Sequence, residues 1–163
     1  NGIEYEFEVE GLVNCPDPDL SGFPSNLVTA TPVSSAVLVC GAAYPSLDTL
    51  WPPNHKLVPI DVLGINDPDD GPITVSIDGI FQDEPVNGRG DGNTSPDATG
   101  IGTDKASVRA ERAGPGNGRV YTVFFTASND GGAQCNGSVT VSVPKSRNRD
   151  AVNDGSLFDS TKP

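Results

Sequence analysis

Apolar and acidic residues alternate strictly near the beginning of the chain, from Ile3 to Val9 (Ile-Glu-Tyr-Glu-Phe-Glu-Val). Successive side chains of a β-strand point to opposite faces, so this pattern predicts a strand with one apolar face and one acidic face. The apolar face would carry Ile3, Tyr5, Phe7 and Val9. We therefore expect a strand within residues 1–13, followed by an irregular connection over residues 14–35, which are rich in Pro, Asp, Ser and Asn.

Further along the chain, short segments with strand composition recur between stretches rich in Gly, Pro, Asp and Asn. They are Ala36–Cys40, Leu57–Leu63, Ile73–Ile80, Ala106–Arg112, Arg119–Ala127 and Gly137–Val143. The last two flank the polar segment Asn129–Gly132, which predicts a β-hairpin. Together with the first strand this makes seven, which is typical of an all-β, immunoglobulin-like antiparallel sandwich of two sheets. We expect that sandwich over residues 36–144, with an extra N-terminal strand before it.

Residues 145–163 form a polar C-terminal arm whose composition alone predicts little structure of its own. Its apolar residues are Leu157 and Phe158, which we expect to anchor the arm. Two docking surfaces are open at this stage: the arm's own domain, or a neighbouring chain.

Composition agrees with an all-β domain and narrows the set of partners. Gly and Pro together number 34 of 163 residues (19 and 15), so turns must be frequent. The net charge is -12, which makes nucleic acid and anionic membrane surfaces unfavourable partners. No run of apolar residues approaches the ~18–20 residues of a membrane span, so membrane insertion is not expected.

The three cysteines, Cys15, Cys40 and Cys135, show no CxxC or Cys/His spacing typical of a zinc site. In an oxidising compartment two of them are able to pair. We favour a Cys15–Cys40 bridge because it would staple the irregular connection. The alternative left open is that all three are small buried apolar residues.

Acidic residues crowd the middle of the chain, with ten between Asp61 and Asp104 against one basic residue, Arg89. Loops rich in Asp, Asn and Gly offer the oxygen ligands that Ca²⁺ requires, although the spacing departs from that of an EF-hand. The candidate ligands are Asp67, Asp69, Asp70, Asp83, Asp91, Asn93, Asp97 and Asp104. The sequence thus predicts bound calcium, and the alternative is a solvated acidic edge that discourages strand pairing.

Two blocks resemble secreted bacterial immunoglobulin-like modules related to hyalin-repeat and PKD-like domains. The first is LWPPNHKLVPI at Leu50–Ile60, and the second is RAERAGPGNGRVYTV at Arg109–Val123. The resemblance covers roughly residues 36–144. It implies an extracellular module, often repeated or appended to larger proteins, with structural, adhesive or calcium-linked roles, and it supplies no catalytic residues.

Within these blocks we assign structural roles to the aromatic and charged residues. Trp51 is expected to fill the core, with a sugar-stacking platform as the alternative. His55 is expected to be a hydrogen-bonded turn residue. Arg109, Glu111, Arg112 and Arg119 are expected to form cross-strand charge pairs on a solvated face.

The sequence contains no histidine-supported nucleophile and no Gly-rich phosphate loop after a strand, so an enzyme is not expected. The leading hypothesis is an extracellular or cell-surface structural or adhesive module, stabilised by calcium. It would act as a filament subunit or as a repeat, and contact its own copies by strand addition or tail docking. The alternative is a carbohydrate-binding module of a secreted hydrolase, with an extracellular polysaccharide as partner.

Overall fold

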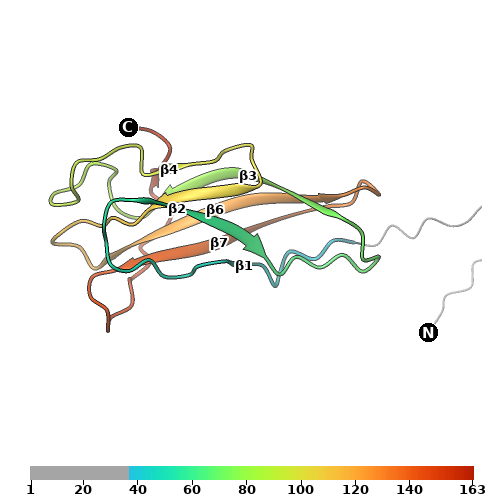
Figure 1. Ribbon diagram of the computed structural model, residues 1–163, viewed down its shortest axis with the longest axis horizontal. Helices are drawn as coiled ribbons and strands as arrows, with labels where there is room; N and C mark the ends of the chain where they lie inside the picture. The colour runs from blue at the N-terminus through green and yellow to red at the C-terminus, as the bar shows by residue number, and fades with distance from the viewer. Residues whose placement is uncertain (1–36) are drawn as a thin grey trace, which may run out of the picture. The chain divides into compact units, whose positions relative to one another are not determined.

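The structure, a computed structural model, describes residues 37–163 and contains β-strands and no helix (Figure 1). No helix in this part of the chain is therefore available to cross a membrane. The predicted strand Ile3–Val9, the irregular connection and Cys15 lie outside the described residues.

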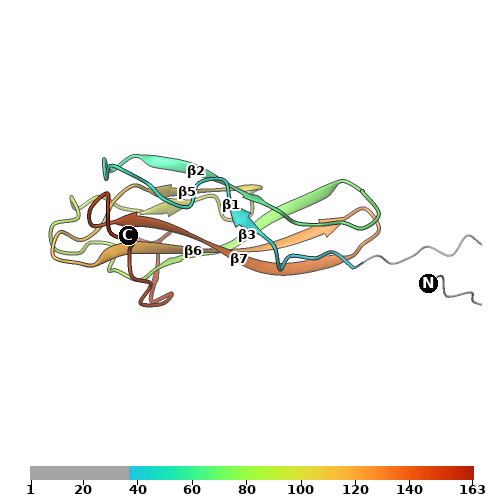
Figure 2. The same ribbon diagram turned by 90° about the horizontal axis from the view of Figure 1, so that it is seen from below.

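Two antiparallel sheets pack face to face as a sandwich (Figures 1 and 2). The first sheet has the order β1 (Tyr44–Pro45), β2 (Leu57–Leu63), β5 (Lys105–Arg109), β4 (Ala98–Thr99). The second has the order β7 (Gln134–Pro144), β6 (Gly118–Asn129), β3 (Ile73–Gln82), β8 (Phe158–Asp159). Strands β1 to β7 follow the connectivity of a constant-type immunoglobulin domain, so the predicted fold class is confirmed.

The core forms because inward positions of each strand are apolar. In β2 the inner positions are Val58, Ile60 and Val62, and the residues between them face outward. Opposite them lie Ile77 and Ile80 of β3 with the inner residues of β6 and β7. The largest aromatic and aliphatic side chains that are fully buried on this inner side of β6 and β7 are Tyr121, Val123, Phe125, Val141 and Val143. Each such burial contributes roughly 1.5–3 kcal/mol to stability.

The predicted hairpin is confirmed, with β6 and β7 paired from Gly118↔Pro144 to Ser128↔Gln134 and the Gly132 N–H donating to the Asn129 carbonyl oxygen. The predicted strand Ala36–Cys40 is wrong in its described part. Only Val39 forms a bridge, to Asn66, because the chain turns at once over Cys40–Ala43. Three short strands, β1, β4 and β8, were not predicted because two residues carry no readable alternation.

A disulfide joins Cys40 to Cys135 across 95 residues of sequence, with a Cα–Cα distance of 5.9 Å. The predicted Cys15–Cys40 bridge is therefore wrong. The physical reason is that the hairpin places Cys135, near the start of β7, beside the segment that enters the sandwich at Cys40. The bond therefore connects the segment that leads into the first sheet with β7, the edge strand of the second sheet.

The C-terminal arm docks on its own domain, along the side of the sandwich opposite β7. Residues 158–159 form β8 beside β3, and Ser160 then links the two sheets. Its carbonyl oxygen accepts from Asp97 N and Ala98 N at 2.9 and 2.8 Å, and its N–H donates to Ile80 O at 3.0 Å. The expected anchors do not hold the arm, since Leu157 is 61% and Phe158 37% exposed, and backbone hydrogen bonds hold it instead.

Candidate functional site

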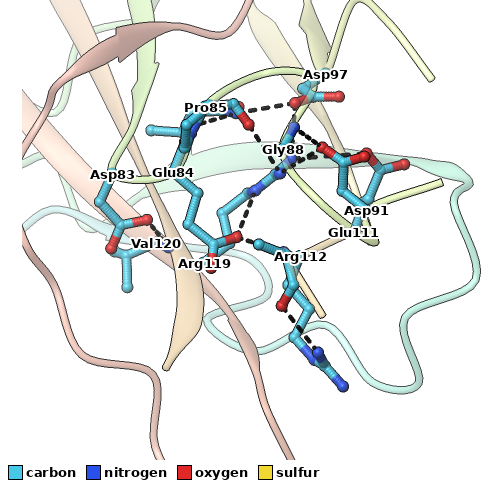
Figure 3. Close-up of polar contacts among 12 residues, drawn as sticks. Asp83, Glu84, Pro85, Gly88, Asp91, Asp97, Glu111, Arg112, Arg119 and Val120 are labelled. Atoms are coloured by element: carbon cyan, nitrogen blue, oxygen red, sulfur yellow. Dashed lines mark hydrogen bonds and ion pairs between the residues drawn. The ribbon is translucent and has the colours of Figure 1, made fainter. Parts of the chain in front are cut away.

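Five charged side chains gather in the interior at the end of the sandwich where β6 begins (Figure 3). We call them the Arg119 cluster: Arg119, Glu84, Asp91, Asp97 and Glu111. Glu84 follows β3, Asp91 and Asp97 lie in the loop before β4, Glu111 follows β5, and Arg119 is the second residue of β6. The cluster therefore brings together segments from both sheets.

Arg119 is the centre of the cluster, and its guanidinium is fully buried. Its Nη1 group donates to Asp97 Oδ2 at 2.7 Å and to the Tyr121 hydroxyl at 3.2 Å, and its Nε–H donates to Glu84 Oε2 at 3.2 Å. Asp91 Oδ2 lies 3.8 Å from Nη2, and Glu111 Oε1 lies 3.9 Å from Nη1. Arg119 is therefore the shared counter-charge of four buried carboxylates.

The carboxylates are also held by neighbouring donors. Glu84 Oε2 accepts from Ala113 N at 2.6 Å. Asp91 accepts from the N–H groups of Gly88 and Asn93, which folds the loop around it. Glu111 Oε2 accepts from the Thr94 hydroxyl and lies 2.8 Å from His55 Nδ1. His55 is thus a hydrogen-bonded turn residue, as predicted.

The electrostatics follow from burial. Burial raises the pKa of Asp97, although the hydrogen bond from Gln82 and the charge of Arg119 work in the opposite direction. Burial alone would lower the pKa of Arg119, but Tyr121, Asp97 and Glu84 hold it above its usual value, so Arg119 stays charged. Within the described residues, Glu84 Oε1, Asp97 Oδ1 and Glu111 Oε1 are buried without a hydrogen-bond partner. Four carboxylates against Arg119 and the neighbouring Arg109 leave the cluster with surplus negative charge.

The arrangement is suited to holding the fold together and not to contacting a substrate, because its side chains are inaccessible to solvent. Tyr121 extends the link: its hydroxyl donates to the Arg109 carbonyl oxygen of β5 at 2.9 Å, which joins β6 to the opposite sheet. This contact is similar to the tyrosine corner of immunoglobulin domains, in which a tyrosine near the start of the equivalent strand bonds to the upstream backbone.

Asp83 has a related role beside the cluster. Its Oδ1 accepts from Val120 N at 2.9 Å and its Oδ2 accepts from Asp154 N at 3.3 Å, so it links β6 to the C-terminal arm. Burial raises the pKa of Asp83, against the effect of these hydrogen bonds. The contact with Asp154 is a second point at which the arm is held to the domain.

The predicted calcium ligands do not come together. Asp83, Asp91 and Asp97 lie at the end where β6 begins. Asp67 lies at the other end, about 35 Å away along the strand, where its Oδ2 accepts from Asn129 Nδ2. The exposed members of the predicted set are Asp69, Asp70, Asn93 and Asp104. In residues 37–163 no group of three or more His, Cys, Asp or Glu side chains has a metal-binding arrangement, and calcium binding stays a prediction.

The predicted solvated charge pairs are wrong for Arg119 and Glu111, both of which are fully buried. The reason can be read in the alternation of β6. Arg119 shares its parity with Tyr121, Val123 and Phe125, so it points into the sandwich with them. That parity was the available signal. Glu111 was already grouped with Arg119, but Glu84 and Asp97 lie 35 and 22 residues before Arg119, too far to be paired with it from sequence.

Trp51 is 43% exposed, so the prediction that it fills the core is wrong. The preceding residue, Leu50, takes the core position at 4% exposure, and Trp51 therefore faces the other way. Trp51 lines a shallow hollow of about 280 Å³ with Leu47, Thr49, Asn54 and Val58, among others. The hollow combines an aromatic ring with a hydroxyl and an amide.

Taken together, the connectivity and the interior links define an immunoglobulin-type antiparallel sandwich whose two sheets are joined by polar and covalent links. Comparisons of the chain with protein-family models, with curated proteins and with solved structures found no match.

Proposed function

We propose that the chain is an extracellular structural or adhesive module, a subunit of a surface filament or a repeat of a larger secreted protein. The observation that carries the proposal is that the two sheets are linked at both ends and along one side. The Arg119 cluster links one end, the Cys40–Cys135 bond links the other, and Ser160 closes the side. Such links resist separation of the sheets, which is what a load-bearing module needs.

The extracellular location is supported by the disulfide, since such bonds form and persist in oxidising compartments. The net charge of -12 supports a protein that stays dispersed until a specific contact forms. Calcium stabilisation remains part of the proposal, supported by the acidic loops of the sequence and by the exposed carboxylates of Asp69, Asp70 and Asp104.

We expect the full chain to assemble as its concentration rises, seen as filaments by electron microscopy and as a rising mass by analytical ultracentrifugation. If calcium contributes, EDTA will fray the filaments and lower the thermal midpoint, and added CaCl₂ will restore both. MgCl₂ at the same concentration is the matched control, because Mg²⁺ demands a stricter octahedral geometry. If EDTA leaves the filaments unchanged, calcium is no longer part of the proposal. Monodisperse monomers at every concentration would contradict the filament version.

A second candidate function, binding of a neutral polysaccharide, is favoured by one observation, the exposed Trp51 ring beside the hollow. We expect Trp51→Ala to abolish binding to neutral glycans on an array while leaving the thermal midpoint within a few degrees of the wild type, because a half-exposed side chain contributes little to the core. Leu157→Ala, a change at another exposed apolar residue, is the control. Absence of binding to any polysaccharide by the wild type would retire this candidate.

A further inference from the structure

One long edge of the sandwich has open backbone hydrogen-bonding groups. Strand β7 borders the second sheet, and at Ser142 its outer side is paired: Ser142 N–H donates to Asp48 O, and Ser142 O accepts from Leu50 N, both at 2.8 Å. Because outward-facing groups recur at every second residue, Thr140, Ser138, Asn136 and Gln134 face the same way. Within residues 37–163 no backbone group pairs with the outer side of β7 between Gln134 and Thr140.

This edge lacks the features that keep natural edges from pairing with other strands. Such features include charged side chains, proline and a very short strand. Residues 134–143 of β7 contain none of the 32 charged residues (22 acidic, 10 basic) of the chain, and no proline. Residues 37–47, which enter the sandwich beside β7, are uncharged too. Figure 2 shows this entry at the end where β7 begins, where the Cys40–Cys135 bond fixes it.

Exposed apolar side chains are concentrated in the entering segment. Of the twelve large hydrophobic side chains exposed in the described part of the chain, five lie within residues 37–51. They are Val37, Val39, Tyr44, Leu47 and Trp51, with exposures from 43% to 71%. An open backbone edge next to a segment rich in exposed apolar side chains fits an incoming strand that is apolar on one face.

We propose that the outer edge of β7 between Gln134 and Thr140 binds the segment Ile3–Val9 of a second copy of this chain. The inference rests on the proposed assembly and names its contact. Residues 3–9 lie outside the described residues, but their sequence fits this edge. Their backbone groups would pair with β7, and Ile3, Tyr5, Phe7 and Val9 would pack against the exposed apolar side chains of residues 37–51. Its three glutamates would then point to solvent, and the outer edge of β7 carries no acidic residue that would repel them.

The choice of edge and of a second copy has physical grounds. The opposite edge, the outer side of β3, is already paired, because β8, Ser160 and residues 102–103 occupy its backbone hydrogen-bonding groups. The connection from Glu10 to Ala36 contains Pro16, Pro18, Pro24 and Pro32, a composition that favours a spacer over a tight return to the same domain. A contact from one copy to the next is heterologous, and it propagates into a filament when the rotation does not close.

The contact is tested by cross-linking two differently tagged proteins in a Cys15→Ser background, one with Glu6→Cys and the other with Ser138→Cys. A short thiol-to-thiol cross-linker should join the two tags, because the central residues of the segment and of the edge lie on adjacent strands. The control acceptor is Thr99→Cys, an exposed residue on the short edge strand β4. A yield at least ten-fold above the Thr99 control supports the proposal. A yield equal to that control overturns it, as does a doubly substituted chain that cross-links only within itself when dilute.

A proline on the edge supplies the second readout. Ser138→Pro removes an N–H that faces away from β6, so the ladder between β6 and β7 should survive and the thermal midpoint should stay near the wild-type value. Assembly should fall at least ten-fold, whereas Ser138→Ala, which keeps the N–H, should assemble as the wild type does. If the wild type forms filaments and Ser138→Pro forms them equally well, this inference is wrong while the proposed function stands. If the wild type stays monomeric at every concentration, this inference is wrong together with the filament version of the proposed function.

Discussion

Replacing Arg119 with methionine is expected to lower the free energy of unfolding by about 3–5 kcal/mol. The substitution keeps an unbranched apolar side chain of similar length but leaves Glu84, Asp91, Asp97 and Glu111 buried without their shared cation. Total stabilities of single domains are roughly 5–15 kcal/mol, so this is a large fraction of the whole. Urea denaturation followed by tryptophan fluorescence measures the loss.

Arg89→Met is the matched control, because Arg89 is exposed and such surface changes usually shift stability by less than about 0.5 kcal/mol. Should the Arg119 variant fail to fold, Asp97→Asn provides a milder test, since it removes one charge of the strongest pair and leaves the arginine with Glu84. A loss below about 1 kcal/mol in the Arg119→Met protein would show that the cluster does not hold the sheets together.

A double-substitution cycle separates the pair from its surroundings. Arg119→Met combined with Asp97→Asn should cost less than the sum of the two single changes, because the second change removes one of the charges that the first leaves unpaired. Asp97 is the informative partner since its Oδ2 also accepts from Gln82 Nε2 at 2.9 Å and its backbone N–H donates to Ser160. Through Asp97, therefore, the cluster and the C-terminal arm support each other.

The strands that alternate over seven or more residues could be predicted from the sequence. Leu57–Leu63 matches β2 at both ends, and β3, β6 and β7 each extend the predicted segment by a few residues. The predicted strand Ala106–Arg112 was too long, since β5 ends at Arg109. The fold class followed because a sandwich is the stable way to bury one face of such strands. The two-residue strands β1, β4 and β8 were missed because tertiary hydrogen bonds, and not local pattern, create them.

The interior was harder to predict for a related reason. Acidic residues crowd the stretch between Asp61 and Asp104, but Arg119, which pairs with three of them, lies outside that stretch, 22 residues after Asp97. The same holds for Cys40 and Cys135, which are 95 residues apart. Local sequence carries no information on which distant residues meet across two sheets. For that reason Cys15 was chosen as the partner of Cys40, and Arg119 was not recognised as the counter-charge of the buried acids.

Removing the Cys40–Cys135 bond is expected to cost about 2–5 kcal/mol of stability. The bond closes a loop of most of the sandwich, and in the chain-entropy account a loop near 100 residues is worth about 4.7 kcal/mol, because the unfolded chain loses that much freedom. The double variant Cys40→Ser/Cys135→Ser should therefore have a lower urea midpoint than the wild type. Cys15→Ser is the control and should leave the midpoint unchanged, since Cys40 already has its partner.

The same variant discriminates between a link that only stabilises and one that positions the assembly edge. Cys135 is the second residue of β7, and Cys40 lies at the entry of the apolar segment, so the bond fixes the two parts of the proposed edge side by side. At a temperature where the double variant is still fully folded, we expect weaker filament formation than for the wild type. Unchanged assembly would show that the edge is positioned by β6 alone, and an unchanged urea midpoint would contradict the entropic role of the bond.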